Sequence, residues 1–257
     1  MKCPLHRQNN IYQNICPALF VAVTSQYNVA MEQIENRNLF QSGHTLAWSF
    51  FEQYRYPWEI LPNISQIIVA IGKTLDPEKY DNPSENVWIA KNAIIAPSAD
   101  IHAPAIIGER TELRHCAFIR GSALVGNDCV VGNSVELKNC IMFDCSQAPH
   151  FNYIGDSILG YMSHTGAGAI TSNLKSDKSK VVVHNGSVSI ETNLLKFGAI
   201  LADNVEVGCN SVLNPGTIVC RNTNIYPASS VRGVIPANSI YKSGKYAEIV
   251  KKNLQNN

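Results

Sequence analysis

Large apolar residues recur every six positions along most of this chain. A small or apolar residue lies two positions before most of them, so each repeat offers a narrow apolar side. A period of six fits neither an α-helix nor isolated strands, and it is typical of hexapeptide repeats stacked into a parallel β-helix. The first series is Ile89, Ile95, Ile101, Ile107, Leu113, Ile119, Val125, Val131, Leu137 and Phe143, and the second is Leu201, Val207, Leu213, Val219, Ile225 and Val231.

Three hexapeptides make one triangular coil of about 18 residues, and successive coils stack about 4.8 Å apart, like neighbouring strands of a sheet. We expect this β-helix to span residues 86–240 and the fold class to be mainly β. The six-residue period is interrupted over 144–153 and 173–195. Irregular excursions from a regular repeat are where function is usually carried.

The remaining segments predict a four-part organisation. Residues 31–85 have apolar residues at helical spacing, broken by prolines, and predict a small helical cap. We expect this cap to close one end of the β-helix, where strand edges and apolar side chains would otherwise be exposed. Residues 1–30 are predicted to be an extension with little regular structure, and residues 241–257 a polar C-terminal tail that forms a short helix or frays.

Composition excludes several classes of partner. The chain has 21 basic and 20 acidic residues, which leaves no charge excess for binding nucleic acid. The apolar run over 15–23 is too short to span a bilayer and contains Pro17, so no membrane partner is expected. The eight cysteines show no CxxC spacing, which indicates a reducing compartment and predicts a cytoplasmic location.

The coil length predicts a column of cations. His102, Arg120 and Lys138 are 18 positions apart and each follows an inward-facing residue. They should therefore project from one face on successive coils. Cations this close repel each other unless an anion lies between them, and Arg with Lys suits a phosphate. The alternative is a pair of solvated cations, one of them paired with Glu136.

A histidine follows this column where the six-residue period breaks. His150 lies in the segment 149–156, and a glycine-rich segment over 164–173 comes after it. A histidine beside an anion site is a candidate general base, because its pKa lies near neutral pH. A purely structural histidine is the alternative interpretation.

Several segments resemble a known family. They are Phe118–Gly121, Val131–Lys138, His150–Asp156 and Thr165–Asn173. They resemble the acetyltransferase half of the bifunctional N-acetylglucosamine-1-phosphate uridyltransferase/glucosamine-1-phosphate acetyltransferase, and still more the stand-alone, pyrophosphorylase-related bacterial proteins that lack the uridyltransferase domain. A resemblance to archaeal sugar-phosphate nucleotidyltransferases continues through Lys196–Ala199 and Asn214–Gly216, so the match covers residues 87–240.

The resemblance implies a left-handed β-helix, a homotrimer with active sites between subunits, and acetyl-CoA as donor. The implied activity is N-acetylation of the amine of a hexosamine 1-phosphate, such as glucosamine 1-phosphate, or of a related sugar, with no metal required. Residues 1–85 lack a glycine-rich nucleotide loop and are too few for a uridyltransferase domain, so we expect no pyrophosphorylase chemistry from this chain.

The resemblance also assigns roles to individual residues. His150 matches the general base, Glu136 an acidic residue beside the site that orients His150 or the amine, and Ala167 a backbone N–H near the acetyl carbonyl. The residues that match substrate-binding positions are Arg120 and Lys138 for the phosphate, Tyr153 and Asn173 for the sugar, His164 where the bacterial family has asparagine, and Lys178 or Lys180. Those that match positions near coenzyme A are Ala167, Cys209 and Pro227.

Two other functions remain open on the sequence. A metalloenzyme of the carbonic-anhydrase type needs three histidines that converge on zinc across a subunit interface. His102, His115, His150, His164 and His184 are available, but they lack the close ligand spacing of that family. The other alternative is a non-catalytic trimeric scaffold or sugar-phosphate-binding protein that has kept the fold. The departure at His164 keeps this alternative open.

Overall fold

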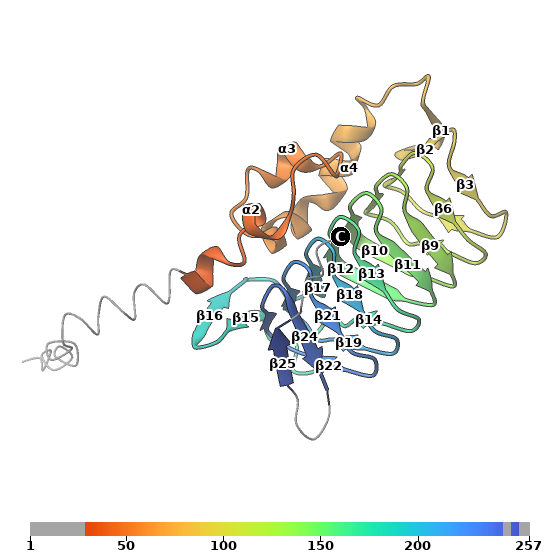
Figure 1. Cartoon of the computed structure of the whole chain (residues 1–257). Helices are drawn as coiled ribbons and strands as arrows, with labels where there is room; N and C mark the ends of the chain where they lie inside the picture. Colours follow the sequence, from red (N-terminus) through yellow and green to blue (C-terminus); the bar gives the residue numbers. More distant parts are fainter. Residues whose placement is uncertain (1–28, 244–247, 252–257) are drawn as a thin grey trace, which may run out of the picture.

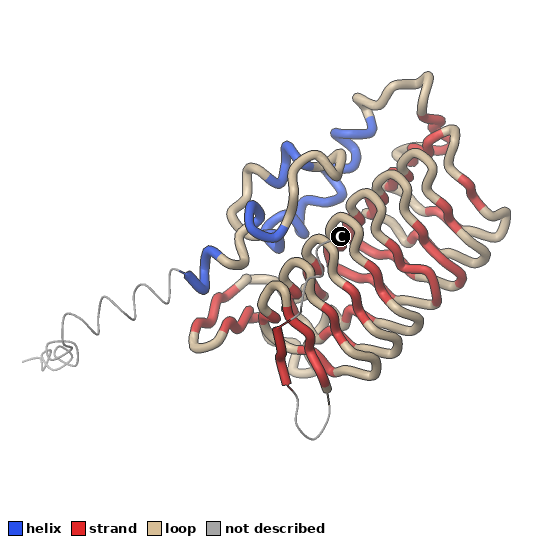
Figure 2. Tube along the Cα trace, viewed as in Figure 1, coloured by secondary structure: helices blue, strands red, loops and turns tan. Residues whose placement is uncertain are grey.

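Stacked coils of short parallel strands form the body of the protein, and a helical region lies along one side of the stack (Figure 1; Figure 2). The computed structural model describes residues 29–243 and 248–251. Most of the predicted extension over 1–30 therefore lies outside the described residues. The helical region contains α2 (Asn36–Leu39), α3 (Trp48–Phe51), the 3₁₀ helix η1 (Pro57–Asn63) and α4 (Ile64–Gly72). The predicted fold class, a mainly β, left-handed parallel β-helix with a small helical region before it, is confirmed.

The described strands form three sheets. The largest contains β1 (Tyr80–Ser84), β2 (Val87–Ala90), β4 (Asp100–Ile101), β5 (Ala105–Ile107), β7 (Phe118–Ile119), β8 (Ala123–Val125), β10 (Glu136–Met142), β12 (Tyr153–Leu159), β14 (Ile170–Thr171), β17 (Ala199–Leu201), β19 (Val212–Leu213), β20 (Thr217–Val219), β22 (Ser230–Val231) and β23 (Val234–Ile235). The second contains β3 (Ile94–Ile95), β6 (Glu112–Leu113), β9 (Val130–Asn133), β11 (Gln147–His150), β13 (His164–Thr165), β18 (Glu206–Val207), β21 (Asn224–Ile225), β24 (Ser239–Lys242) and β25 (Glu248–Lys251). The third is the hairpin of β15 (Val182–Asn185) and β16 (Val188–Glu191).

The coils present three faces, which we name by what lies on them. The helix face consists of β2, β5, β8, β17, β20, β23 and the C-terminal parts of β10 and β12. The cation face consists of β4, β7, β14, β19, β22 and the N-terminal parts of β10 and β12. The third face is the second sheet.

The hydrogen-bond register confirms the predicted coil. Ile119 lies opposite Leu137, and Val125 lies opposite Ile107, so residues 18 apart stack on neighbouring coils. These inward side chains have an exposed fraction of 0%. Burying one large aliphatic side chain stabilises a fold by about 1.5–3 kcal/mol, so the repeated column supplies much of the driving force for stacking.

The helical region covers the side of the β-helix, so the prediction that it closes one end is wrong. Helix α4 contacts β5, β8 and β10, and η1 contacts β12 (Figure 1). The physical reason is a column of outward-facing apolar residues on the helix face that would otherwise be exposed to water. Its members are Ile106, Leu124, Ile141, Ile158, Ile200 and Ile218, each with an exposed fraction of 0%. At the expected position of the cap, Ile89 and Ile95 in the first coil stay partly exposed.

The six-residue period shifts after Lys138. Cys140 lies opposite Ala123 and Met142 opposite Val125, a spacing of 17 residues. Ile141 therefore faces outward under the helices, and the next residue of the predicted series, Phe143, packs against the helical region. Its ring centroid lies 4.8 Å from that of Phe40 in this region. The turn before Cys140 is one residue shorter than in the preceding coils, and the regular apolar pattern of the sequence does not show this.

The two predicted interruptions have different outcomes. Residues 144–153 do not leave the coil, because β11 continues the third face between β9 and β13. Residues 173–195 do leave it, and they carry the β15–β16 hairpin. The sequence predicts a C-terminal tail that forms a short helix or frays. Its described part instead contains β25, which pairs antiparallel with β24 and covers the C-terminal end of the stack (Figure 1).

Candidate functional site

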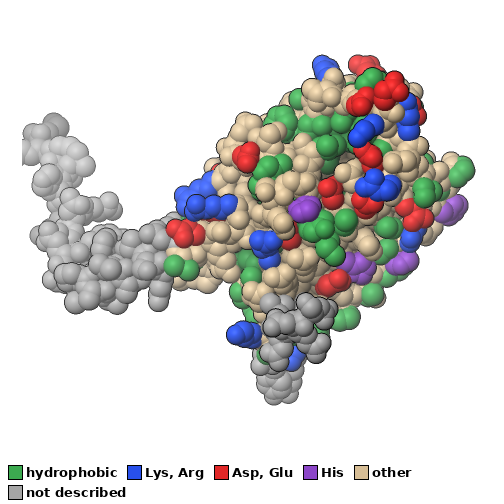
Figure 3. All heavy atoms as spheres, turned by 45° about the horizontal axis from the view of Figure 1, so that its top comes forward, with side chains coloured by type: hydrophobic (Ala, Val, Ile, Leu, Met, Phe, Trp, Pro, Cys, Tyr) green, Lys and Arg blue, Asp and Glu red, His purple; other side chains and the backbone are tan. Residues whose placement is uncertain are grey.

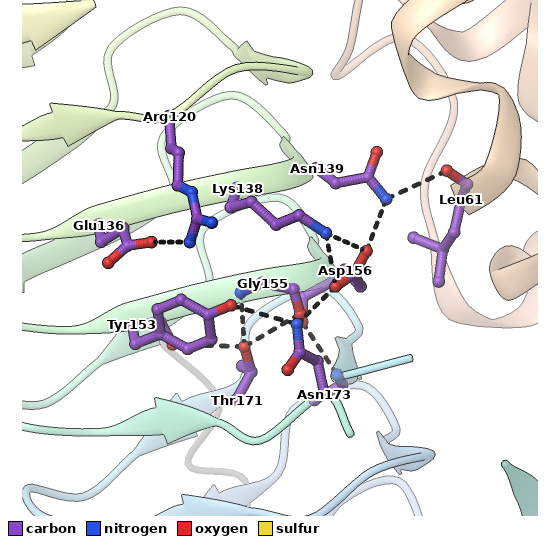
Figure 4. A network of polar contacts seen from close by, with 12 residues as sticks. Leu61, Arg120, Glu136, Lys138, Asn139, Tyr153, Gly155, Asp156, Thr171 and Asn173 are labelled. Atoms are coloured by element: carbon purple, nitrogen blue, oxygen red, sulfur yellow. Dashed lines mark hydrogen bonds and ion pairs between the residues drawn. The ribbon is translucent and has the colours of Figure 1, made fainter. Parts of the chain in front are cut away.

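The predicted cation column is present on the cation face. Arg120 donates its backbone N–H to the carbonyl of Leu137 at 2.8 Å, which places Arg120 and Lys138 on adjacent coils. Both cations are paired with carboxylates. Arg120 Nη1 lies 2.9 Å from Glu136 Oε1, and Lys138 Nζ lies 3.0 Å from Asp156 Oδ1 (Figure 4). The charge repulsion that predicted a bound anion is thus relieved within the chain.

Asp156 is the centre of a polar network that joins the site to its surroundings. Its carboxylate is almost fully buried and accepts hydrogen bonds from Lys138, Asn139 and Asn173. The amide of Asn139 also donates to the carbonyl of Leu61 at 3.2 Å (Figure 4). Since Leu61 belongs to η1, the helical region is tied directly to the charged site.

Tyr153 lies across the cation face beside this network. Its hydroxyl accepts a hydrogen bond of 3.1 Å from Asn173 Nδ2 (Figure 4). Gly155 leaves the space, because a Cβ there would lie 2.5 Å from the Tyr153 hydroxyl oxygen. Burial raises the pKa of Tyr153, and the nearby Asp156 carboxylate raises it further. The phenol therefore stays protonated near neutral pH and can donate to a ligand oxygen.

His150 lies on the neighbouring edge of the coil, between the third face and the cation face. Backbone hydrogen bonds from one coil to the next define a ladder along this edge, which we call the histidine edge. The ladder consists of His115, Asn133, His150, Ala167, Cys209 and Pro227. The structure thus stacks His150 with the three residues expected near coenzyme A.

The corner after His150 brings this edge next to the cation face. His150 ends β11 and Tyr153 begins β12, with Phe151 and Asn152 between them. Asn152 is buried and holds the corner, since its Nδ2 donates to the carbonyl of Gly166 at 2.8 Å and its Oδ1 accepts from the His150 N–H at 3.2 Å. The imidazole of His150 is exposed and, within the described part of the chain, has no hydrogen-bond partner.

Ala167 has the geometry of a backbone donor. Its carbonyl accepts from the N–H of Asn210 at 2.8 Å. Its own N–H has no acceptor among the described residues, and the residue is only half-buried. A free N–H one coil away from His150 can reach a ligand that lies along the edge.

Three predicted site residues, His164, Lys178 and Lys180, lie apart from these two groups. His164 projects from the third face, where its Nδ1 lies 3.0 Å from Glu206 Oε2. Lys178 and Lys180 are in the excursion, and Lys180 Nζ donates to Asn193 at 3.1 Å. Glu136 is paired with Arg120 and makes no hydrogen bond to His150, contrary to one of its two expected roles.

The sequence analysis missed Asp156 and Asn139. A count of 18 from Lys138 reaches Asp156, but the 17-residue coil puts Gly155 opposite Lys138, and Asp156 reaches Lys138 from one residue beyond. Asn139 gives no signal in the sequence, because its amide bridges Asp156 and a helical segment far away in the chain.

The described residues contain no group of three or more His, Cys, Asp or Glu side chains placed to hold a metal ion. None of their helices has the length and apolarity needed to cross a bilayer. On the visible face, basic and acidic side chains alternate and form no continuous basic patch (Figure 3).

Comparisons with known proteins agree with the predicted resemblance. The chain is 30% identical over 79% of its length, and over 50% of the relative, to a protein of Methanococcus maripaludis named "Bifunctional protein GlmU". It is 26% identical over 82% of its length, and 55% of the relative, to a Sulfurisphaera tokodaii protein named "Bifunctional sugar-1-phosphate nucleotidylyltransferase/acetyltransferase". The chain therefore spans about half the length of the curated relatives it matches.

Among solved structures, the polysialic-acid-specific acetyltransferase NeuO superposes with a TM-score of 0.42 and 13% identity, covering 66% of this chain and 88% of NeuO. The acetyltransferase domain of PglB from Neisseria gonorrhoeae, solved with acetyl coenzyme A, superposes with a TM-score of 0.26 and 12% identity, covering 72% of this chain and 64% of that domain. The family described as the GMPPB C-terminal domain matches residues 83–249, which is most of the chain, and this chain belongs to that family.

Proposed function

We propose that this chain is an acetyl-CoA-dependent N-acetyltransferase that acts on the amine of a hexosamine 1-phosphate or a related sugar. One observation carries the proposal: the cations Arg120 and Lys138 lie on successive coils of the cation face, and the exposed His150 lies at the corner that leads into this face on the next coil. The name of the Sulfurisphaera relative, which combines a sugar 1-phosphate with acetyl transfer, supports the same substrate class.

The reaction follows from the groups at this corner. The neutral imidazole of His150 takes a proton from the sugar amine as the nitrogen attacks the thioester carbonyl carbon. A C–N bond forms, and the carbonyl oxygen gains negative charge that the Ala167 N–H stabilises. The C–S bond then breaks, and the departing thiolate takes the proton back from His150, which yields coenzyme A and the N-acetyl sugar.

The cation face supplies binding and orientation. A phosphate beside Arg120 and Lys138 shares these cations with Glu136 and Asp156, so two carboxylates fix the cations in place before the ligand arrives. The protonated Tyr153 donates to a sugar hydroxyl, and Asn173 orients Tyr153. In this proposal Cys209 and Pro227, further along the histidine edge, lie beside coenzyme A.

We further propose that the active form is a cytoplasmic homotrimer whose sites lie between subunits. In such a trimer the exposed histidine edge faces a neighbouring subunit, whose surface completes the site around His164 and the excursion lysines Lys178 and Lys180. Sedimentation of the purified chain tests this assembly directly: a monomeric enzyme with full activity contradicts it.

A free-thiol assay with acetyl-CoA and a panel of hexosamine phosphates tests the activity. We expect His150→Gln to lower turnover by about 10²–10⁴-fold, the usual contribution of a placed general base. His115→Gln is the matched control, because His115 lies on the same histidine edge and should leave turnover unchanged. Full activity of His150→Gln would remove the imidazole from the mechanism.

The thiol assay, combined with binding calorimetry, decides between this enzyme and the non-catalytic alternative. A scaffold or sensor binds the hexosamine phosphate in calorimetry but releases no thiol from acetyl-CoA. The pairing of His164 with Glu206 is the observation that keeps this alternative, because it holds a predicted substrate-binding residue on a different face.

A further inference from the structure

A further arginine lies on the line of the cation column and has no partner. The outward column of the cation face continues from Lys138 through Gly155, Ser172 and Asn214 to Arg232, as the registers of successive strands require. The earlier basic side chains of this column all lie beside carboxylates: the His102 ring is 3.1 Å from Asp100, and the cations Arg120 and Lys138 are paired with Glu136 and Asp156. The exposed guanidinium of Arg232 makes no hydrogen bond or ion pair among the described residues.

Arg232 lines a hollow between the cation face and the excursion. This cavity has a volume of about 270 Å³, and its polar lining is Ser172, Lys175, Ser176, Asp177, Asn214 and Arg232. Lys175 Nζ lies 3.6 Å from Asp177 Oδ2. Asp177 also accepts from the N–H and hydroxyl of Ser179, so its negative charge is already shared. The lining thus holds two cations and one carboxylate, with hydroxyl and amide groups around them.

The wall formed by the excursion is held firmly against the coil. A Cβ on Gly216 would lie 2.7 Å from the Val181 side chain, and one on Gly233 would lie 2.9 Å from the carbonyl oxygen of His184. Both glycines have a positive φ and permit this close approach. The part of the excursion that follows the hollow is therefore packed closely against the coil, and one of these contacts is at the residue next to Arg232.

We propose that Arg232 and Lys175 bind a phosphate group that lies at the far end of an extended ligand of the proposed acetyltransferase. Arg232 is four coils from Lys138, which corresponds to about 19 Å at about 4.8 Å per coil. A hexosamine 1-phosphate is too short to reach both places. One substrate of the proposed reaction is long enough and carries such a phosphate: coenzyme A, through its 3′-phosphate. Both phosphates of a nucleoside diphosphate hexosamine lie next to the sugar, so that ligand places no phosphate at this distance.

Calorimetry with four ligands tests this inference, which rests on the proposed function for its choice of ligands. Coenzyme A is compared with dephospho-coenzyme A, and a uridine diphosphate hexosamine with the matching hexosamine 1-phosphate. Arg232→Gln should weaken binding of the ligand with the distant phosphate about 10- to 100-fold, the loss expected for charge-assisted hydrogen bonds. Arg232→Lys should recover part of that loss, because it restores the charge without the fork of donors.

The matched control is Arg114→Gln. The Arg114 side chain is 40% exposed and is paired with Glu112 on the third face, where the same change of charge should leave every dissociation constant as in the unaltered protein. An effect on coenzyme A but not on dephospho-coenzyme A assigns the hollow to the 3′-phosphate. An effect on the nucleotide-linked sugar alone contradicts the inference, because that ligand has no phosphate at its far end.

Failure of this inference is distinguishable from failure of the proposed function. If thiol is released and Arg232→Gln binds all four ligands as tightly as the unaltered protein does, the phosphate site is refuted and the enzyme remains. If binding depends on Arg232 but no thiol is released, the site remains and the acetyltransferase is refuted. Circular dichroism of Arg232→Gln must match the unaltered protein for either conclusion, and Lys175→Gln provides a second, independent variant.

Discussion

Replacing Asp156 with Asn should destabilise the fold strongly, although the two side chains have the same shape. The buried carboxylate accepts from Lys138 Nζ at 3.0 and 3.1 Å and from two asparagine amides. Asn offers one acceptor oxygen, so one donor loses its partner and Lys138 loses its counter-charge. Breaking a buried ion pair from one side costs about 3–5 kcal/mol. The Lys138 side chain is 25% exposed and regains some hydration, so we expect about 3 kcal/mol.

For a domain of this size that loss corresponds to a fall in Tm of about 6–12 °C. Thermal and urea unfolding should be followed by circular dichroism at a fixed protein concentration, because assembly would shift the midpoint. Asp128→Asn is the matched control. Asp128 also forms an ion pair, in this case with an arginine at 2.7 Å, but its side chain is 42% exposed. Loss of its negative charge should therefore change stability little.

A double-mutant cycle with Lys138→Met shows whether the ion pair is the cause. With both charges removed, the combined loss should be smaller than the sum of the single losses by about 1–2 kcal/mol. Additive losses, or a fall of less than about 1 kcal/mol for Asp156→Asn alone, would refute the view that this carboxylate is the centre of the site's charge balance.

Three further predictions follow from the same structure. Ile141→Ala should cost about 2–5 kcal/mol in urea unfolding because Ile141 is buried under the helices, whereas Ile94→Ala, at a side chain that is 65% exposed, should cost little; equal losses would contradict the burial of Ile141 under the helices. Gly155→Ala should displace the Tyr153 ring and return its raised pKa toward the ordinary value. In spectrophotometric titration, the difference from the Tyr153→Phe variant isolates the Tyr153 signal, and a Tyr153 pKa that stays raised in Gly155→Ala would contradict this. Burial raises the pKa of Asp203, so its stabilising contribution is present below the unfolded pKa and is lost as pH rises through the folded pKa; Asp203→Asn should flatten that part of the Tm-against-pH curve, and an unchanged slope would refute it.

Hydrogen bonds between the helical region and the coil make the geometry of the site depend on segments that are distant in the chain. Asn139 connects η1 to Asp156, and Asp203 accepts the N–H of Gln41 at 2.6 Å on another edge of the coil. A helical region that merely closed one end would leave the cation face independent of it. Because it covers the side, a loss of packing there changes the position of Asp156 and, through it, of Lys138.

The repeat in the sequence predicted the parts of the site that depend on counting along a regular coil. Arg120 and Lys138 lie on one column because Ile119 lies opposite Leu137 and the Arg120 N–H donates to the Leu137 carbonyl. The same count does not place Asp156 on this column, because the next coil has 17 residues and puts Gly155 opposite Lys138. The alternative interpretation of the sequence paired one cation with Glu136, but the count could not assign Asp156 to Lys138, because that pairing depends on side-chain rotamers and on the space left by Gly155.

By itself the sequence determined the β-helix, the stacking of residues 18 apart and the existence of the excursion over 173–195, because each follows from local spacing and from the need to bury one narrow apolar side. Only the tertiary structure decided where the helices lie, since the apolar column on the helix face is formed by residues from six separate coils. It also decided the 17-residue coil after Lys138, the carboxylate partners of the cations and the open hollow at Arg232. These features depend on contacts between segments distant in the chain, and no periodicity within one segment records them.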